Sequence, residues 1–168
     1  MATTSQAFPL APMSTFIRVL TLALLALPVA FIVASQLWGA PRLSVGLLLV
    51  ALMGWVWLWM RPSRFVVRAD AIEVNWPLRR RYIARAGINQ VRLLDRAELR
   101  AITGAAARVG VGGLWGGFGW LWTQRRGIVQ MYVSRADGLV WIERGAERPW
   151  LITPASPAAF VRALGGDA

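Results

Sequence analysis

Residues 19–60 read VLTLALLALPVAFIVASQLWGAPRLSVGLLLVALMGWVWLWM, two uncharged runs of 23 and 18 residues separated by Arg42. A helix rises about 1.5 Å per residue, so about 20 apolar residues cross a hydrocarbon core about 30 Å thick. Residues 39–42, between the two predicted helices, are Gly-Ala-Pro-Arg, which is typical of a turn. The stretch therefore predicts a transmembrane hairpin of two helices, about Val19 to Trp38 and about Leu43 to Met60.

Arginine is more frequent after the second helix than in the turn between the helices. The turn contains only Arg42, whereas the arginines that follow the second helix include Arg61, Arg64, Arg68, Arg79, Arg80 and Arg81. Positively charged segments stay on the cytoplasmic side of a membrane. We therefore expect the C-terminal part, and with it the N-terminus, to be cytoplasmic. A cleaved signal peptide ending near residues 33–35 is the alternative, but almost no basic residue precedes the apolar run.

The types of residue that are missing exclude most enzyme chemistry. The charged residues are 19 arginines and 8 carboxylates, without lysine, histidine or cysteine, and the net charge is +11. The chain thus has no thiolate nucleophile, no Ser-His-acid triad, no ordinary zinc or haem site and no Walker A lysine. Asp95 and Glu98 lie at helical spacing, but the neighbouring Arg92, Arg96 and Arg100 favour ion pairing. We expect no enzymatic activity, no cofactor and no metal.

The positive charge lies mostly after the helices. Residues 61–168 contain 17 of the arginines and all 8 acidic residues, which gives this part a net charge of +9. A basic residue beside a membrane gains about 1 kcal/mol from anionic lipids. The six arginines named above are therefore candidates for lipid binding. The alternative is that they set the topology, with Arg79, Arg80 and Arg81 on a solvated edge strand. No nucleic-acid recognition motif accompanies the charge, so we do not expect RNA or DNA as a partner.

The rest of the chain divides into a tail and a domain. Residues 1–14 are uncharged and rich in Ala, Thr, Ser, Pro and Met, and predict a disordered tail. Residues 15–60 are the hairpin, and residues 61–168 alternate between short apolar runs and turn residues. Strands are predicted at about residues 64–68, 72–76, 78–84, 88–94, 128–134, 139–143 and 150–153. Residues 95–108 predict a helical turn or a mobile loop, and Ser156-Pro157 starts a final helix.

Residues 108–123 are unusually rich in glycine and aromatic side chains. Their centre contains Gly113, Trp115, Gly116, Gly117, Phe118, Gly119 and Trp120. A dinucleotide-binding loop is excluded, because its third glycine would fall at Trp115. A third transmembrane helix is disfavoured by a length of about 14 residues and by the glycine content. We expect a loop whose rings either pack on the sheet or enter the membrane interface, and the sequence leaves both open.

About seven strands followed by one helix is the outline of a pleckstrin-homology-like barrel. The glycine-aromatic segment, the later strand Trp141-Ile142-Glu143 and the ending from Thr153-Pro154 to Phe160 resemble the bacterial PH-domain family found behind two transmembrane helices. The resemblance covers about residues 62–165. It implies a membrane-anchored α+β protein of the bacterial inner membrane, with a PH-like barrel of about seven antiparallel strands and one C-terminal helix. Phosphoinositide-binding PH domains use a basic loop between their first two strands. The corresponding loop here is Ala69-Asp70-Ala71, which contains no basic residue.

These observations lead to two functional expectations. The first is a non-enzymatic inner-membrane protein whose cytoplasmic PH-like domain binds a protein partner or its own copies. The second is recognition of anionic lipid by the arginine surface. Transport is the least favoured role, because neither apolar helix contains an ionisable side chain along its span.

Overall fold

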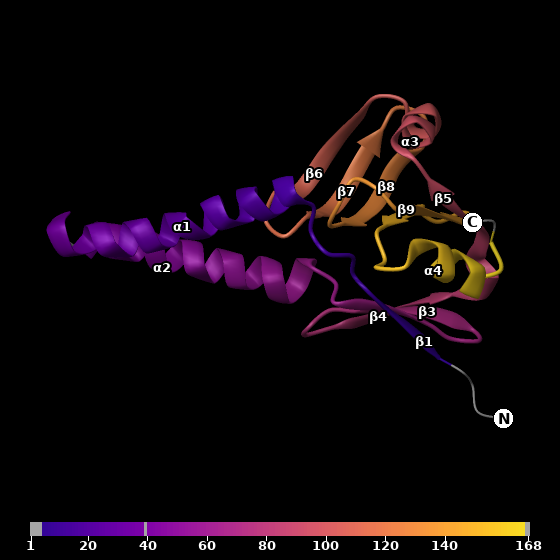
Figure 1. Ribbon diagram of the computed structural model, residues 1–168, viewed down its shortest axis with the longest axis horizontal. Coiled ribbons are helices and arrows are strands. Elements are labelled where there is room, and N and C mark those ends of the chain that lie inside the picture. The colour runs from indigo at the N-terminus through magenta and orange to yellow at the C-terminus, as the bar shows by residue number, and fades with distance from the viewer. Residues whose placement is uncertain (1–4, 39, 167–168) are drawn as a thin grey trace.

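Two long helices form the N-terminal part of the protein. The computed structural model describes residues 5–38 and 40–166. Helix α1 (Thr15–Trp38) is followed by α2 (Ala40–Trp55), which continues as a π-helical turn, η1 (Val56–Met60). Both helices are long and apolar enough to cross a membrane. Figure 1 shows them side by side, extending from one end of a β-rich domain. The expected helical hairpin is present, and its first helix begins at Thr15 rather than Val19.

The two helices approach each other closely at Gly46 of α2. A Cβ added to Gly46 would lie 2.7 Å from Ile32 Cγ1 and 3.2 Å from the carbonyl oxygen of Pro28, both on α1. Small residues are common at helix crossings in membranes because they let the backbones pack directly. The hairpin is therefore held together by a close contact in the middle of both helices.

A four-stranded antiparallel sheet adjoins the end of the hairpin. Its strands, in their order across the sheet, are β1 (Gln6–Pro9), β2 (Arg64–Val67), β3 (Ala71–Asn75) and β4 (Arg80–Ala84). Strand β1 precedes the two helices and β2 follows them, yet they are paired neighbours with Phe8 opposite Phe65. Both ends of the helical hairpin are therefore joined to one sheet.

The second sheet has six strands in the order β5-β9-β10-β8-β7-β6. Their bounds are β5 (Ile88–Leu94), β6 (Ala106–Gly112), β7 (Gly117–Thr123), β8 (Gly127–Val133), β9 (Leu139–Arg144) and β10 (Trp150–Ile152). Neighbours are antiparallel except β10 and β8, which are parallel. A 3-10 turn, η2 (Arg85–Gly87), connects the two sheets, and two short helices, α3 (Arg96–Thr103) and α4 (Pro157–Ala163), complete the domain.

Each face of the six-stranded sheet buries its own hydrophobic cluster. One face packs against the four-stranded sheet and α4, and its largest side chains with less than 2 % exposure are Phe65, Phe118, Trp150 and Phe160. The opposite face contributes Leu94, Leu121, Val129, Met131, Val133, Leu139, Trp141 and Leu151. Leu99 and Ile102 of α3 pack on this second cluster. Because α3 has only eight residues, it covers the second face over a short length.

The structure corrects the predicted barrel of about seven strands. The seven predicted strands are present, but β1, β6 and β7 are additional, and the strands of the described residues form two separate sheets that do not close. The prediction that residues 1–14 form a disordered tail is wrong for residues 6–11. Residues 6–9 pair with the edge of β2, and Phe8, Leu10 and Ala11 are buried. Residues 1–4 of that tail lie outside the described part of the chain.

The glycine-aromatic segment forms a β-hairpin rather than the predicted loop. Gly110 on β6 lies opposite Gly119 on β7, and a Cβ on Gly110 would lie 2.4 Å from the carbonyl oxygen of Phe118. Both glycines have positive φ angles, 135° and 130°, which residues with side chains rarely adopt. Glycine therefore permits a close strand pair here, and residues 113–116 form its turn.

Helix α3 begins with a capping box rather than with the predicted ion pairs. The Asp95 carboxylate accepts a hydrogen bond from the backbone N–H of Glu98 at 2.7 Å, and the Glu98 carboxylate accepts one from the backbone N–H of Asp95 at 2.8 Å. These bonds satisfy N–H groups that the first turn of a helix leaves unpaired. Arg96 instead donates to the carbonyl oxygen of Ala136 at 3.1 Å.

Candidate membrane-surface site

The four-stranded sheet places Arg64 and Arg80 together on its outer face. Arg64 lies opposite Asn75 on β3, and Asn75 lies opposite Arg80 on β4. The residues that alternate with them, such as Phe65 and Val74, point into the core, so these arginines point away from it. Arg79 precedes β4 and lines a hollow of about 510 Å³ together with Arg64 and Arg80.

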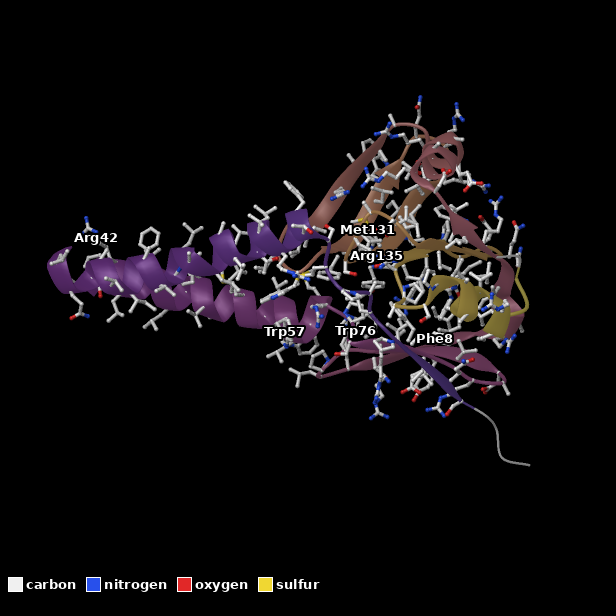
Figure 2. The ribbon with its side chains drawn as sticks, in the orientation of Figure 1. Phe8, Arg42, Trp57, Trp76, Met131 and Arg135 are labelled. Atoms are coloured by element: carbon white, nitrogen blue, oxygen red, sulfur yellow. The ribbon has the colours of Figure 1, made fainter. Side chains whose placement is uncertain are left out.

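The turn between β3 and β4 is attached to the end of the helical hairpin. The indole N–H of Trp76 donates a hydrogen bond to the carbonyl oxygen of Met60 at 3.2 Å. The guanidinium of Arg79 lies 4.3 Å from the centre of the Trp76 ring. Figure 2 shows Trp57 and Trp76 at the junction of the helices and the domain, with Arg42 at the far end of the hairpin. Arginines of this turn are thus held beside the residues where a helix would leave a membrane.

Arg61 completes this basic surface. It follows η1 directly, and its guanidinium lies 4.3 Å from the centre of the Trp57 ring. Burial lowers the pKa of Arg61, and its Nε has no hydrogen-bond partner. A guanidinium remains protonated in proteins despite such a change. We refer to Arg61, Arg64, Arg79 and Arg80 as the membrane-end arginines.

Arg68 lies at the opposite end of β2 and is bound to a buried carboxylate. Its Nε donates to Glu73 at 2.8 Å, and Glu73 is 2 % exposed. The hydrogen bond from Arg68 lowers the pKa of Glu73, burial opposes this change, and the charges of Arg68 and Arg80 lower it further. The same hydrogen bond raises the pKa of Arg68. Arg68 therefore neutralises Glu73, and the structure does not group it with the membrane-end arginines.

Arg81 points to the inner side of its sheet and lies in a groove between the two sheets. Its guanidinium lies 5.2 Å from the centre of the Trp150 ring, and that of Arg144 lies 5.8 Å from the same ring. Trp120 and Gln130 line the groove with Arg81. Arg79 and Arg80 also line part of this groove, but alternation along β4 sends the side chains of Arg80 and Arg81 to opposite faces of the sheet.

The turn of the glycine-aromatic hairpin is attached to α1. The hydroxyl of Thr21 donates to the carbonyl oxygen of Gly113 at 3.0 Å and accepts from the backbone N–H of Trp115 at 2.9 Å. The Trp115 ring meets the Trp57 ring edge to face, with centres 4.9 Å apart. Phe118 lies in the core, and Trp115 packs both against that core cluster and on the Trp57 ring.

Three residues of this junction were not among the predicted site residues. Thr21, Trp57 and Trp76 make the contacts that attach the domain to the helices. The sequence signal for Thr21 is a polar side chain two residues inside an apolar run, where an unpaired hydroxyl would be costly. No local pattern marks Trp57 as a contact of the domain or Trp76 as a hydrogen-bond donor to Met60.

The chemistry of the junction suits anionic groups. It offers guanidinium groups and indole rings, which bind phosphate and carboxylate through charge-assisted hydrogen bonds. Within residues 5–38 and 40–166, no cluster of three or more His, Cys, Asp or Glu side chains could hold a metal ion. The junction is therefore a cationic surface, and the described residues contain no group of side chains that could bind a metal ion.

Comparison with known proteins identifies the domain. The family model described as Bacterial PH domain matches residues 63–168, which is more than half of the chain. No curated protein and no solved structure matches the chain. The matched range begins just before β2, so it includes the two sheets apart from β1 and excludes both long helices.

Proposed function

The chain belongs to the bacterial PH domain family, and we propose that it is a non-enzymatic inner-membrane protein whose domain binds anionic lipid head groups. In this proposal α1 and α2 cross the bilayer, both termini are cytoplasmic, and the membrane-end arginines contact the lipids. The excess of arginine after α2 supports this orientation. The absence of His, Cys and Lys from the sequence supports a binding role rather than a catalytic one.

The observation that carries this proposal is the fixed attachment of the domain to the hairpin. Strands β1 and β2 join the two ends of the hairpin to one sheet. Thr21 attaches the Gly113–Gly116 turn to α1, and Trp76 attaches the β3–β4 turn to Met60. These contacts leave no free linker between helix and domain, so the membrane-end arginines remain at one depth beside the bilayer.

Because the helices anchor the protein, lipid binding would change the lipids around it rather than its membrane affinity. A basic residue near an anionic surface contributes about 1 kcal/mol, which corresponds to about a fivefold preference per contact. We therefore expect the lipids next to the protein to be enriched in phosphatidylglycerol over phosphatidylcholine. Salt should reduce this enrichment, since exposed charges are screened.

The test measures the relative association of spin-labelled phosphatidylglycerol and phosphatidylcholine with the full chain in mixed vesicles. The triple variant R64Q/R79Q/R80Q should lower the preference for phosphatidylglycerol by at least about fivefold, the effect of one arginine contact. The control R125Q/R148Q/R162Q removes the same charge from exposed positions elsewhere in the domain. An unchanged preference in the first variant, or an equal loss in the control, would refute the proposal.

Self-association is a second candidate function, favoured by the outer edge of the six-stranded sheet. Strand β6 is the last strand of this sheet, and its residues are exposed except for Val111, which is partly buried. Val109 of β6 is 53 % exposed, and Trp120 and Trp122 of the neighbouring β7 are 42 % and 64 % exposed. An unpaired strand edge next to exposed apolar side chains is a template for pairing with another chain.

Cysteine crosslinking in the native membrane tests this second function, because the chain contains no cysteine. Val109→Cys on β6 should form a covalent dimer with a short bismaleimide if two copies pair along this strand. Ala86→Cys, an exposed position in η2, is the control and should remain monomeric. Monomer alone from Val109→Cys would exclude pairing along β6.

A further inference from the structure

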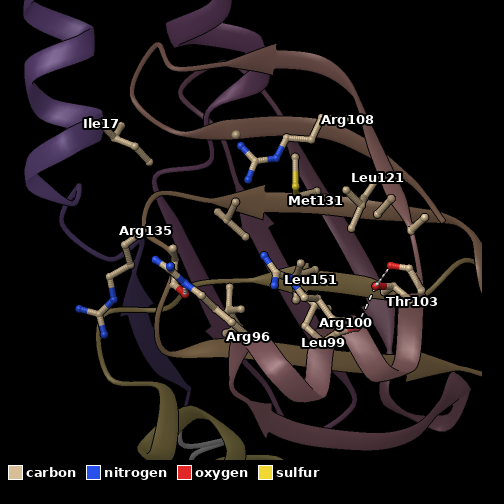
Figure 3. A pocket seen from close by; sticks show the side chains of 17 residues that line it. Ile17, Arg96, Leu99, Arg100, Thr103, Arg108, Leu121, Met131, Arg135 and Leu151 are labelled. Carbon is tan, nitrogen blue, oxygen red and sulfur yellow. Dashed lines mark hydrogen bonds between the residues drawn. The ribbon is translucent and has the colours of Figure 1, made fainter.

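A large cavity lies between α3 and the six-stranded sheet. Its volume is about 740 Å³, within the range of about 300–1,000 Å³ that is typical of small-molecule sites. The floor is apolar and consists of Leu99, Leu121, Met131, Val133, Leu139 and Leu151. Figure 3 shows α3 on one side of this cavity and the strand that carries Arg108 on the other. The cavity exists because the short helix leaves part of this sheet face uncovered.

Four arginines surround the cavity. Arg96 and Arg100 come from α3, Arg108 comes from β6 and Arg135 follows β8. Figure 3 shows Arg100 and Arg108 extending over the cavity from opposite sides. Among the described residues, neither of these two forms an ion pair, and no Asp or Glu lines the cavity. Arg135 has a partner outside the lining, since it lies 3.5 Å from Asp137.

One end of the cavity adjoins the helix that is expected to enter the bilayer. Ile17, in the first turn of α1, lines the cavity, and Figure 3 places Ile17 and Arg135 at the end opposite Thr103. Thr21, one turn further along α1, already contacts the turn that packs on Trp57. If α1 enters the bilayer as proposed, the end of the cavity that Ile17 lines is at the level of the lipid head groups.

We propose that this cavity binds an anionic single-chain lipid taken from the bilayer. The apolar floor holds the acyl chain, and Arg100 and Arg108 bind the carboxylate or phosphate of the head group through charge-assisted hydrogen bonds. A free inorganic anion would leave the floor unused, and a neutral lipid would leave the guanidinium groups without a counter-charge. The inference rests on the proposed membrane attachment, but it uses none of the membrane-end arginines.

The test uses palmitate with a photoactivatable diazirine in its chain, added to the full-length protein in phosphatidylcholine nanodiscs. After irradiation, peptide mass spectrometry locates the adducts. We expect adducts on the floor, in the peptides that contain Leu121, Met131 or Leu151. Oleate and oleoyl lysophosphatidylglycerol should compete for labelling, whereas neutral monoolein should not. Adducts confined to α1 and α2, or equal competition by monoolein, would overturn the proposal.

Paired variants separate the cavity from nonspecific labelling. Ala106 lines the cavity, whereas the neighbouring Ala107 is exposed and lies opposite Trp122 on the other face. Ala106→Phe should abolish floor labelling, and Ala107→Phe should preserve it. R100Q/R108Q should lower floor labelling by at least about fivefold, as expected for the loss of one charged contact, whereas R148Q/R162Q should not. Floor labelling that persists in Ala106→Phe would contradict the assignment.

The same variants distinguish this inference from the proposed function. R64Q/R79Q/R80Q should leave floor labelling by palmitate unchanged, because none of these arginines lines the cavity. R100Q/R108Q should leave the preference for phosphatidylglycerol around the helices unchanged. Loss of floor labelling in R64Q/R79Q/R80Q would show that the two sites are not separate and would refute the cavity as an independent site.

Discussion

At the scale of single residues, Glu73 shows how a carboxylate is kept on a basic sheet. It is 2 % exposed and lies between Arg68, whose Nε donates to it at 2.8 Å, and Arg80, whose Nη1 is 3.8 Å away. Removing an ionised carboxylate from water is costly unless cations and hydrogen bonds replace the water. Arg68 therefore mainly compensates the negative charge of Glu73. Arg80 is mostly exposed, so its guanidinium is also accessible to other anions.

This arrangement predicts a pH-dependent contribution to stability. The hydrogen bond from Arg68 holds the pKa of Glu73 below its usual value of 4.5. Ionised Glu73 therefore stabilises the fold above about pH 4.5, and this contribution is lost as the pH falls through the lowered pKa. We expect the melting temperature of the full chain to exceed that of Glu73→Gln at neutral pH, with the difference shrinking on acidification. Tryptophan fluorescence during heating measures this.

The exposed carboxylate Asp137 provides the control for Glu73. Its side chain is 75 % exposed, and its ion pair with Arg135 is on the surface, where such pairs contribute little. Asp137→Asn should therefore leave the pH dependence of the melting temperature close to that of the unchanged protein. A gap between the unchanged protein and Glu73→Gln that stays constant down to low pH would contradict the role given to Glu73.

At the scale of elements, the helical hairpin depends on one small residue. We expect Gly46→Ala to destabilise the α1–α2 packing by about 1–3 kcal/mol, because the new methyl group meets Ile32 and the backbone at Pro28. Gly54 lies on the same helix with nothing within 4 Å of its missing Cβ. Gly54→Ala should be neutral or stabilising, by up to about 1 kcal/mol from helix propensity. Helical circular dichroism during thermal unfolding compares the two, and equal melting temperatures would contradict this packing.

The elements that the sequence predicts are those with strong local patterns. The two helices follow from uncharged runs, and strands such as β5 and β9 follow from alternation bounded by turn residues. Strand β1 has no such pattern, because Gln6–Pro9 is ordered by pairing with an edge that lies more than fifty residues later in the chain. Strands β6 and β7 could not be predicted, because glycines are rare in strands. The positive φ angles of Gly110 and Gly119 are explained only by the close pairing of the two strands.

At the scale of the whole molecule, long-range contacts decide which predicted site residues lie together. Composition predicts a basic domain beside a membrane, and four of the six candidate arginines gather at the junction with the helices. Arg68 instead binds Glu73, and Arg81 instead lies beside the Trp150 ring. No pattern in the sequence associates either arginine with its partner. The α3 cavity could not be predicted, because its lining is assembled from α1, α3, β6, β7, β8, β9 and β10.

The pairing of β1 with β2 constrains the order of assembly. Strand β1 is synthesised first, but its partner is synthesised only after both helices. The four-stranded sheet therefore cannot be completed until the hairpin has been made. If only one helix crossed the bilayer, β1 and β2 would be on opposite sides and Phe8 could not reach Phe65 and Phe160 in the core. In the proposed topology, completion of this sheet thus distinguishes a chain with both helices inserted from a chain with only one inserted.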